Sequence, residues 1–405
     1  MEETKAMEFV PYVISWNLTQ RCNLRCKHCY IDAATAMPGE LSTGEALRVL
    51  DEIAEVCRET ILILSGGEPL LRPDLDALVA RAAAVGMTVV LGTNGTLLTD
   101  DRSRALAESG LSGVGISLDS LVSSRHDAFR GVAGAWRAAI EGINAAERAG
   151  LDVQIQMTLT RDTLGELPEV VQFARQARVR VLTIFFLVCT GRGQDLVDLT
   201  PEEYERALEW LADVKTDGVM IRPRCAPTFR RVLAQTKPDS FLLNSDAGRC
   251  MAGKNYCRIM PDGKLTPCPY MPLVAGSLRE HSFGAIWRSA QHFQALRNPA
   301  LQGRCGVCEY RELCGGCRAR AFAASGNPLA EDPWCTYIPG TDQLPQGGED
   351  TVVLWTAEAE AKLKKIPYFF RRTVRAAIDA IARQQGVATV TPAFLDEARR
   401  RMRPS

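Results

Sequence analysis

Short apolar runs alternate with stretches of helical spacing over the first half of the chain. Residues 43–55 and 75–85 place apolar side chains every three or four positions, which is typical of amphipathic helices. The apolar runs between such stretches predict strands at 12–19, 60–65, 87–94, 112–119, 152–160 and 179–188. Strands that alternate with helices indicate an α/β fold with a parallel sheet. Six strands do not fill an eight-stranded barrel, so we expect a partial (β/α)6 barrel of the TIM type.

The pattern changes near residue 220. Beyond residue 229, cysteine, glycine and proline replace the regular spacing, so we expect bound metal rather than a large core to hold this region together. A stretch rich in proline, glycine and acids then precedes a helical end. The predicted organisation is a tail (1–10), an α/β domain (11–228), an irregular domain (229–340), a linker (341–352) and a small helical domain (353–405).

Charge and hydropathy narrow the class of protein. The 48 Lys and Arg balance the 48 Asp and Glu, so no overall field attracts nucleic acid or a membrane surface. The first residues lack the apolar core of a signal peptide, and no apolar stretch reaches the roughly 18 residues of a membrane span. We therefore expect a cytoplasmic protein. Its 14 cysteines are then better explained as metal ligands than as disulfides.

Three of these cysteines follow the first predicted strand. Cys22, Cys26 and Cys29 have the spacing C-x3-C-x2-C, in a loop where βα domains place their chemistry. Iron–sulfur cubanes normally take four thiolates, so three would leave one iron with an open position. The alternative is a zinc site completed by His28, although its place between Cys26 and Cys29 would strain such a site.

The stretch CNLRCKHCY resembles the cluster-binding motif of the radical S-adenosylmethionine (SAM) enzymes. In that family, SAM occupies the open iron, and its reductive cleavage gives a 5′-deoxyadenosyl radical that abstracts hydrogen from the substrate. The resemblance implies a [4Fe–4S] cluster, SAM and an electron donor such as flavodoxin or ferredoxin. The protein would position and shelter the radical, while the cofactors supply the reactive chemistry.

Loops after the next strands fit the same family. SGGEP (65–69) looks like its GGEP motif, although alone it would be an ordinary turn. TNG (93–95) and SLD (117–119) occupy strand ends from which family members contact SAM, while helix capping remains open for Asn94 and Asp119. His28 stands where an aromatic residue usually lies near the adenine. The SAM-binding residues implied by the resemblance are His28, Gly66, Gly67, Glu68, Pro69, Thr93, Asn94, Ser117 and Asp119.

A second group of cysteines resembles the SPASM extension of these enzymes. The resemblance implies two auxiliary [4Fe–4S] clusters, the first held by Cys250, Cys257, Cys268 and Cys317, and the second by Cys305, Cys308, Cys314 and Cys335. Two residues separate Cys314 from Cys317, where the family usually has three. A zinc ribbon is the alternative. Pro269 follows Cys268, so the acid that serves as a base in sulfatase-maturing members is missing.

The remaining candidates carry weaker signals. We expect Cys225 to be a buried structural thiol, although it is also a candidate iron ligand. Cys57 is expected in a helix core, and Cys189 has no assigned role. His126 is expected in a surface loop. No residue stands out as a general acid or base, so the catalytic residues are unassigned.

Several segments indicate the substrate. Residues 250–270 and 314–335, with TGRG (190–193) and CAP (225–227), resemble radical SAM enzymes that process tetrapyrrole side chains toward heme d1 or heme. Residues 355–398 are similar to the C-terminal domain of the protochlorophyllide reductase B subunit. This tail carries a net charge of +6, from 11 basic and 5 acidic residues in 353–405. Its aromatic run 368–370 beside two arginines suits a flat macrocycle with propionates, or else packs in a small core.

We therefore expect a radical SAM enzyme that alters or removes propionate or acetate side chains of a siroheme-derived tetrapyrrole, by hydrogen abstraction and C–C cleavage. The alternatives are a SPASM-type maturase of peptides or proteins, and an electron-carrying iron–sulfur protein that is not an enzyme.

Overall fold

The computed structural model describes residues 9–401 apart from 178, 216–217, 245–248, 342–352 and 367. A ten-stranded sheet with the order β10-β9-β8-β1-β2-β3-β4-β5-β6-β7 forms its centre. Seven consecutive strands of this sheet run parallel: β1 (Val13–Asn17), β2 (Ile61–Ser65), β3 (Thr88–Thr93), β4 (Gly113–Ser117), β5 (Asp152–Leu159), β6 (Val181–Phe186) and β7 (Met220–Arg224). The expected α/β fold with a partial TIM-like barrel is confirmed.

One strand more than expected completes this part of the sheet. β7 has the sequence MIRPR, whose arginines and proline hide it from a search for apolar runs. It nevertheless pairs with β6 along its whole length, from Val181 beside Met220 to Phe185 beside Arg224. Its place at the open edge of the parallel strands explains how a strand with two charged residues and a proline is tolerated.

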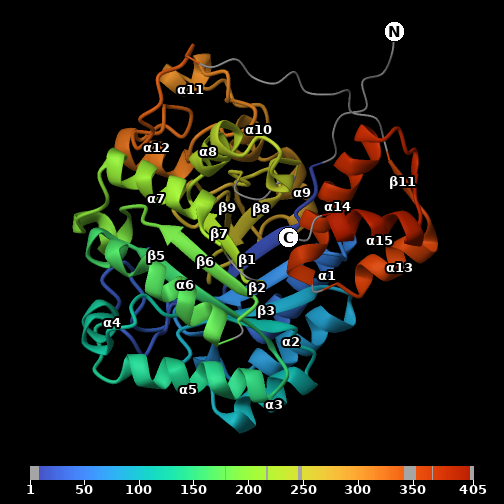
Figure 1. Cartoon of the computed structure of the whole chain (residues 1–405). Helices are drawn as coiled ribbons and strands as arrows, with labels where there is room; N and C mark the ends of the chain where they lie inside the picture. Colours follow the sequence, from blue (N-terminus) through green and yellow to red (C-terminus); the bar gives the residue numbers. More distant parts are fainter. Residues whose placement is uncertain are drawn as a thin grey trace.

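Helices cover the outer face of the sheet (Figure 1). They are α1 (Thr43–Val56), α2 (Leu75–Ala84), α3 (Asp100–Glu108), α4 (Ser123–Arg130), α5 (Ala135–Arg148), α6 (Leu167–Gln176), α7 (Pro201–Asp213) and α8 (Thr228–Thr236). Ser42 and Glu45 form a capping box that begins α1, and Ala46, Val49 and Ile53 on its apolar stripe are buried. The barrel core lies between these stripes and the sheet.

The cysteine-rich region continues the same sheet. β8 (Tyr256–Ile259) pairs in parallel with β1 on the side opposite β2, and β9 (Lys264–Thr266) and β10 (Gly276–Ser277) follow antiparallel. Short helices complete this region, namely α9 (Phe283–Ser289), α10 (Gln291–Arg297), α11 (Gly303–Val307) and α12 (Arg318–Ser325). The loops that connect these strands and helices carry most of the second group of cysteines.

The C-terminal residues fold around a small core of their own, which includes Ala359, Ile378 and Leu395. This part contains β11 (Leu354–Trp355), α13 (Ala357–Lys364), α14 (Tyr368–Gln384), β12 (Thr389–Val390) and α15 (Pro392–Arg401). Across the described part of the chain, no helix combines the length and apolar character needed to cross a bilayer.

Candidate functional site

The loop after β1 brings Cys22, Cys26 and Cys29 together, with Leu24 and Ala135 packed against them. The Cys22 thiol accepts a hydrogen bond from the backbone N–H of Leu24 at 3.4 Å, and the Cys29 thiol accepts one from Ala33 at 3.3 Å. Burial raises the pKa of the Cys22 thiol to about 11. Three thiols in one loop are the donor set that an iron–sulfur cluster takes, so the loop fits such a group.

Two glycines of the second loop allow it to lie directly on the cysteine loop. The N–H of Gly67 donates to Thr19 O at 2.7 Å, and the N–H of Glu68 donates to Arg21 O at 2.8 Å. A Cβ on Gly67 would lie 2.2 Å from Arg21 O, and one on Gly66, whose φ is +142°, would lie 2.4 Å from Thr19 O. The two glycines are therefore required by the close approach of the backbones.

Glu68 lies behind this contact and fixes it. Its carboxylate accepts hydrogen bonds from the Thr93 hydroxyl at 2.8 Å and from the N–H groups of Asn94 and Leu70 at 2.9 and 3.1 Å. The side chain is fully buried, and this burial raises the pKa of Glu68 to about 7. The residue thus connects the loops after β2 and β3.

Asp119 also acts behind the surface of the site. Its carboxylate accepts a 2.6 Å bond from Arg130 Nε, and the Arg130 guanidinium extends to the Cys26 thiol at 3.6 Å. Asp119 therefore orients a cation beside a cluster cysteine and caps no helix. His126 was expected on the surface, but this was wrong, because its side chain is 1% exposed and its Nδ1 accepts the Asp119 N–H at 3.2 Å.

Asn94 is likewise engaged in a loop rather than at a helix end. Its amide oxygen accepts from Thr96 N at 2.9 Å, and its amide nitrogen donates to Asn23 at 2.8 Å. The helix that follows is capped by Thr99 instead. Asn94 thus joins the loop after β3 to the cysteine loop.

His28 stacks on Phe129, with ring centroids 4.3 Å apart and planes at 9°. Burial lowers the pKa of His28 to about 3, so the ring is neutral, and its Nδ1 has no hydrogen-bond partner in the structure. Within the described residues, no three Cys, His, Asp or Glu side chains converge on a point where a single metal ion would bind.

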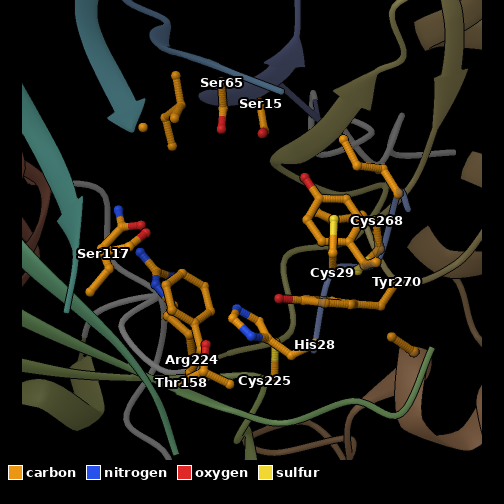
Figure 2. A pocket seen from close by; sticks show the side chains of 18 of the residues that line it. Ser15, His28, Cys29, Ser65, Ser117, Thr158, Arg224, Cys225, Cys268 and Tyr270 are labelled. Carbon is orange, nitrogen blue, oxygen red and sulfur yellow. The ribbon is translucent and has the colours of Figure 1, made fainter. Parts of the chain in front are cut away.

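A cavity of about 350 Å³ opens beside these loops (Figure 2). Of the residues expected to bind SAM, its lining includes His28, Gly66, Gly67, Thr93, Asn94 and Ser117. Glu68, Pro69 and Asp119 lie outside the lining. The carboxylates of Glu68 and Asp119 support the loops that the other residues belong to.

Four further cysteines meet in the lining of this cavity, but they are not the expected four. Cys250, Cys268 and Cys317 lie together as expected, and their fourth neighbour is Cys225. Burial raises the pKa of the Cys225 thiol, and the three other thiols raise it further. Cys225 thus has the surroundings of an iron ligand rather than those of an isolated structural thiol.

The expected fourth member, Cys257, lies elsewhere because of strand alternation. In β8 it pairs with Ile14 of β1, and both side chains are fully buried in the barrel core. The residues one position earlier, Tyr256 and Val13, line the cavity. Successive strand residues face opposite sides of a sheet, so Cys257 faces away from the other thiols.

The second expected quartet is brought together by the structure. Cys305, Cys308, Cys314 and Cys335 surround a small pocket of about 20 Å³ lined also by Arg231 and Arg304. The thiols of Cys305 and Cys314 accept hydrogen bonds from the N–H groups of Asp332 at 3.5 Å and Gly316 at 3.4 Å. The short C-x2-C spacing before Cys317 is accommodated by Gly315 and Gly316, both with φ of +65°.

Two features of the cavity had no clear signal in the sequence. Tyr30, Tyr256 and Tyr270 line it between the two groups of thiols, and the rings of Tyr30 and Tyr270 meet edge to face at 5.2 Å. Arg224 also lines it, at the end of the strand that the apolar pattern missed. Each of these tyrosines lies within two residues of a cysteine in the sequence. This closeness to a cysteine is the signal that could have identified them.

The TGRG segment after β6 holds the cysteine loop in place. Arg192 donates from Nε to Cys26 O at 3.0 Å and from its guanidinium to Asp32 at 2.7 Å, while its backbone N–H donates to Cys29 O at 3.0 Å. A Cβ on Gly191 would lie 2.6 Å from Cys29 O. This segment therefore supports the cluster loop through its backbone and one arginine.

The tail contributes nothing to this lining among its described residues. The side chains of Tyr368, Phe369, Phe370 and Arg372, expected either to form a face for a macrocycle or to pack in a small core, lie outside the described residues. Arg371 donates to Ile366 O at 2.7 Å within the tail itself.

Comparison with known families agrees with this geometry. Residues 16–174 match the radical SAM superfamily, residues 250–318 match the iron–sulfur cluster-binding SPASM domain, and residues 355–399 match the proto-chlorophyllide reductase 57 kD subunit. The chain is 38% identical to the AdoMet-dependent heme synthase of Methanosarcina barkeri, over 83% of this chain and 99% of that protein.

Other relatives are more distant. The pre-heme d1 synthase of Dinoroseobacter shibae is 34% identical over 80% of this chain and 87% of its own length. The mycofactocin maturase MftC of Mycobacterium ulcerans is 33% identical over 83% and 90%. Among solved structures, SuiB of Streptococcus suis bound to S-adenosylmethionine has a similar fold, with a TM-score of 0.65 and 18% identity over 81% of this chain and 78% of that chain.

Proposed function

Because the chain belongs to the radical SAM superfamily and carries its SPASM domain, we propose that it is a SAM-dependent enzyme acting on side chains of a siroheme-derived tetrapyrrole. The sequence similarity of the chain to an AdoMet-dependent heme synthase and to a pre-heme d1 synthase supports this substrate class. The reaction would begin with hydrogen abstraction from a propionate or acetate arm, and cleavage of a C–C bond in that arm would follow.

One observation carries the proposal. The lining of one cavity includes the thiols of Cys22, Cys26 and Cys29 together with the quartet that contains Cys225. A substrate in this cavity would lie next to both a radical source and a second iron site. When bound, the cluster and SAM supply a 5′-deoxyadenosyl radical at the first of these sites.

The chain's own residues suit a flat aromatic substrate. Tyr30, Phe185, Tyr256 and Tyr270 line the cavity and offer ring faces and edges to a macrocycle. Gly66, Gly67, Thr93, Asn94 and Ser117 lie at the carboxyl ends of β2 to β4, where we propose that SAM binds. Glu68 and Asp119 would hold these loops and Arg130 in place without contacting SAM.

We further propose two auxiliary clusters with a ligand set that differs from the expected one. Cys225, Cys250, Cys268 and Cys317 would hold the cluster next to the substrate. Cys305, Cys308, Cys314 and Cys335 would hold the other. The first would provide a redox centre next to the substrate that can take up the electron released when the C–C bond breaks, and the second would provide a further redox centre outside the cavity. An external donor such as flavodoxin or ferredoxin would reduce the radical SAM cluster.

The test uses anaerobic protein with all clusters reconstituted. Titration with didecarboxysiroheme and with iron coproporphyrin III should change the visible spectrum of the tetrapyrrole. Adding SAM and a reductant should then produce 5′-deoxyadenosine together with a tetrapyrrole that has lost carboxyl carbon. SAM cleavage without any tetrapyrrole binding would support a peptide maturase instead, and the absence of SAM cleavage would favour an electron carrier.

A further inference from the structure

The cavity has a marked imbalance of charge. Its lining includes Arg130, Arg192, Arg224 and Arg249, whereas no Asp or Glu is among the described residues that line it. Protein cavities of this kind hold anions, because a guanidinium in a low-dielectric space is stabilised by a carboxylate or phosphate at hydrogen-bond distance. Each arginine can therefore be examined for the partner that the protein itself supplies.

Three of the four arginines donate to an oxygen of the protein itself, either a carboxylate oxygen or a backbone oxygen. Arg130 donates to the Asp119 carboxylate at 2.6 Å, and Arg192 donates to Asp32 at 2.7 Å. Arg249 donates to the backbone oxygen of Glu312 at 2.9 Å, which directs it toward the surface. These three side chains are thus committed to structural contacts.

Arg224 differs from them. The hydrogen bond described for its guanidinium is a 4.0 Å contact from Nη1 to the thioether sulfur of Met251, which is a weak acceptor. A guanidinium stays charged in proteins, and the described lining holds no carboxylate, so the positive charge of Arg224 faces the cavity without an acidic partner among the described residues.

The backbone is unusual at the residue that follows Arg224. Cys225 has φ of +58°, a left-handed conformation that non-glycine residues rarely adopt. With this turn, Arg224 and Cys225 both line the cavity, and Figure 2 shows them among the side chains around it. Strain of this kind is maintained where the resulting side-chain positions serve a site.

We propose that Arg224 binds a propionate or acetate carboxylate of the tetrapyrrole and so fixes how the macrocycle is oriented between the two iron sites. This inference rests on the proposed function and adds a specificity-determining residue to it. A planar guanidinium can pair with a carboxylate through two parallel hydrogen bonds, which sets orientation as well as affinity. An arm held by Arg224 is kept in one place while another arm lies at the radical source.

The experiment compares binding of iron coproporphyrin III and of its methyl ester by visible titration of the reconstituted, SAM-loaded protein. The wild type should bind the free acid more tightly than the ester. In Arg224→Met, affinity for the acid should fall by about tenfold or more, and the preference for the acid over the ester should shrink. Arg224→Lys should give an intermediate loss, because it retains charge without the two-pronged geometry. Arg222→Met is the matched control, since Arg222 lies on the same strand but outside the lining, and its affinity should be unchanged.

Three results would overturn this role. Equal affinity of the wild type and Arg224→Met for the free acid would show that Arg224 does not bind the substrate. Weakened SAM binding with unchanged porphyrin binding would assign Arg224 to the SAM carboxylate. A changed auxiliary-cluster spectrum with unchanged porphyrin affinity would show that it neutralises the cluster at Cys225. Iron content of each variant reports whether it folds, and failure of the wild type to bind any tetrapyrrole would remove the proposed function and this inference together.

Discussion

Arg320 and Asp332 form a buried ion pair, with Nη1 and Oδ2 3.2 Å apart, between the two quartets of auxiliary cysteines. The Asp332 carboxylate also accepts the backbone N–H of Cys317 at 2.7 Å, and its own N–H donates to the Cys305 thiol at 3.5 Å. Arg320 donates to the backbone oxygen of Cys225 at 2.9 Å. One ion pair therefore joins cysteines of both quartets.

Asp332→Ala should destabilise this region strongly. It would leave the Arg320 charge buried and unpaired, a change that costs roughly 3–5 kcal/mol. We expect a lower free energy of unfolding and less bound iron per chain, measured anaerobically by denaturant titration and iron analysis. Glu331→Gln is the control, because its pair with Arg304 is 39% exposed on both sides and should contribute less than about 1 kcal/mol. Equal losses in the two variants would contradict the structural importance of the buried pair.

Cys225→Ser should lower the number of bound clusters, whereas Cys257→Ser should not. The first removes a thiol next to Cys250, Cys268 and Cys317, so we expect loss of one auxiliary cluster from the iron and sulfide content and from the electron paramagnetic resonance spectrum. The second places a hydroxyl in the barrel core, so it should lower stability but leave the cluster count unchanged. The reverse pattern would restore Cys257 as a ligand.

Gly67→Ala should disrupt the contact between the two loops at the SAM site. Its Cβ would lie 2.2 Å from a backbone oxygen that is held by hydrogen bonds, so one loop has to move. We expect at least a tenfold loss of SAM affinity by equilibrium dialysis, which is about 1.4 kcal/mol. Gly44→Ala, in α1 with nothing within 4 Å of the new Cβ, should keep SAM affinity and slightly raise stability. Unchanged SAM binding by Gly67→Ala would contradict this account of the loop.

Glu68 should make stability depend on pH. Its pKa is raised from 4.5 to about 7 in the folded protein, so between these values the folded state keeps a proton that the unfolded chain has lost. Stability from this group therefore falls as pH rises through this window, by up to about 3 kcal/mol. Glu68→Gln cannot titrate, so its free energy of unfolding relative to wild type should increase between pH 5 and pH 8. Parallel pH profiles of the two proteins would show that Glu68 is already ionised at pH 5.

The apolar pattern identified β1 to β6, and the spacing of Cys22, Cys26 and Cys29 identified the cluster loop, because both signals are local. β7 escaped because MIRPR contains no apolar run, and its position is set by pairing with β6. The ligand role expected for Cys257 came from the resemblance to the SPASM extension, whereas the orientation of its side chain depends on the register of β8 with Ile14.

Other features depended on contacts between segments far apart in the sequence. Cys225 is separated from Cys317 by most of the cysteine-rich region, so no spacing rule connects them. His126 is buried because α4 packs its N-terminal turn against the loop that holds Asp119. The absence of acids from the described cavity lining likewise emerges only when strand ends and loops from the whole chain are brought to one place.

The parallel ladder between β8 and β1 has a consequence for electron flow. Cys22 follows β1, and Cys268 follows β9, which pairs with β8, so short connections tie both thiols to one continuous sheet. Backbone pairing, rather than contact between two separate bodies, therefore sets the distance between the two sites. If each site holds the cluster that we propose, the distance over which an electron would pass between them is built into the scaffold.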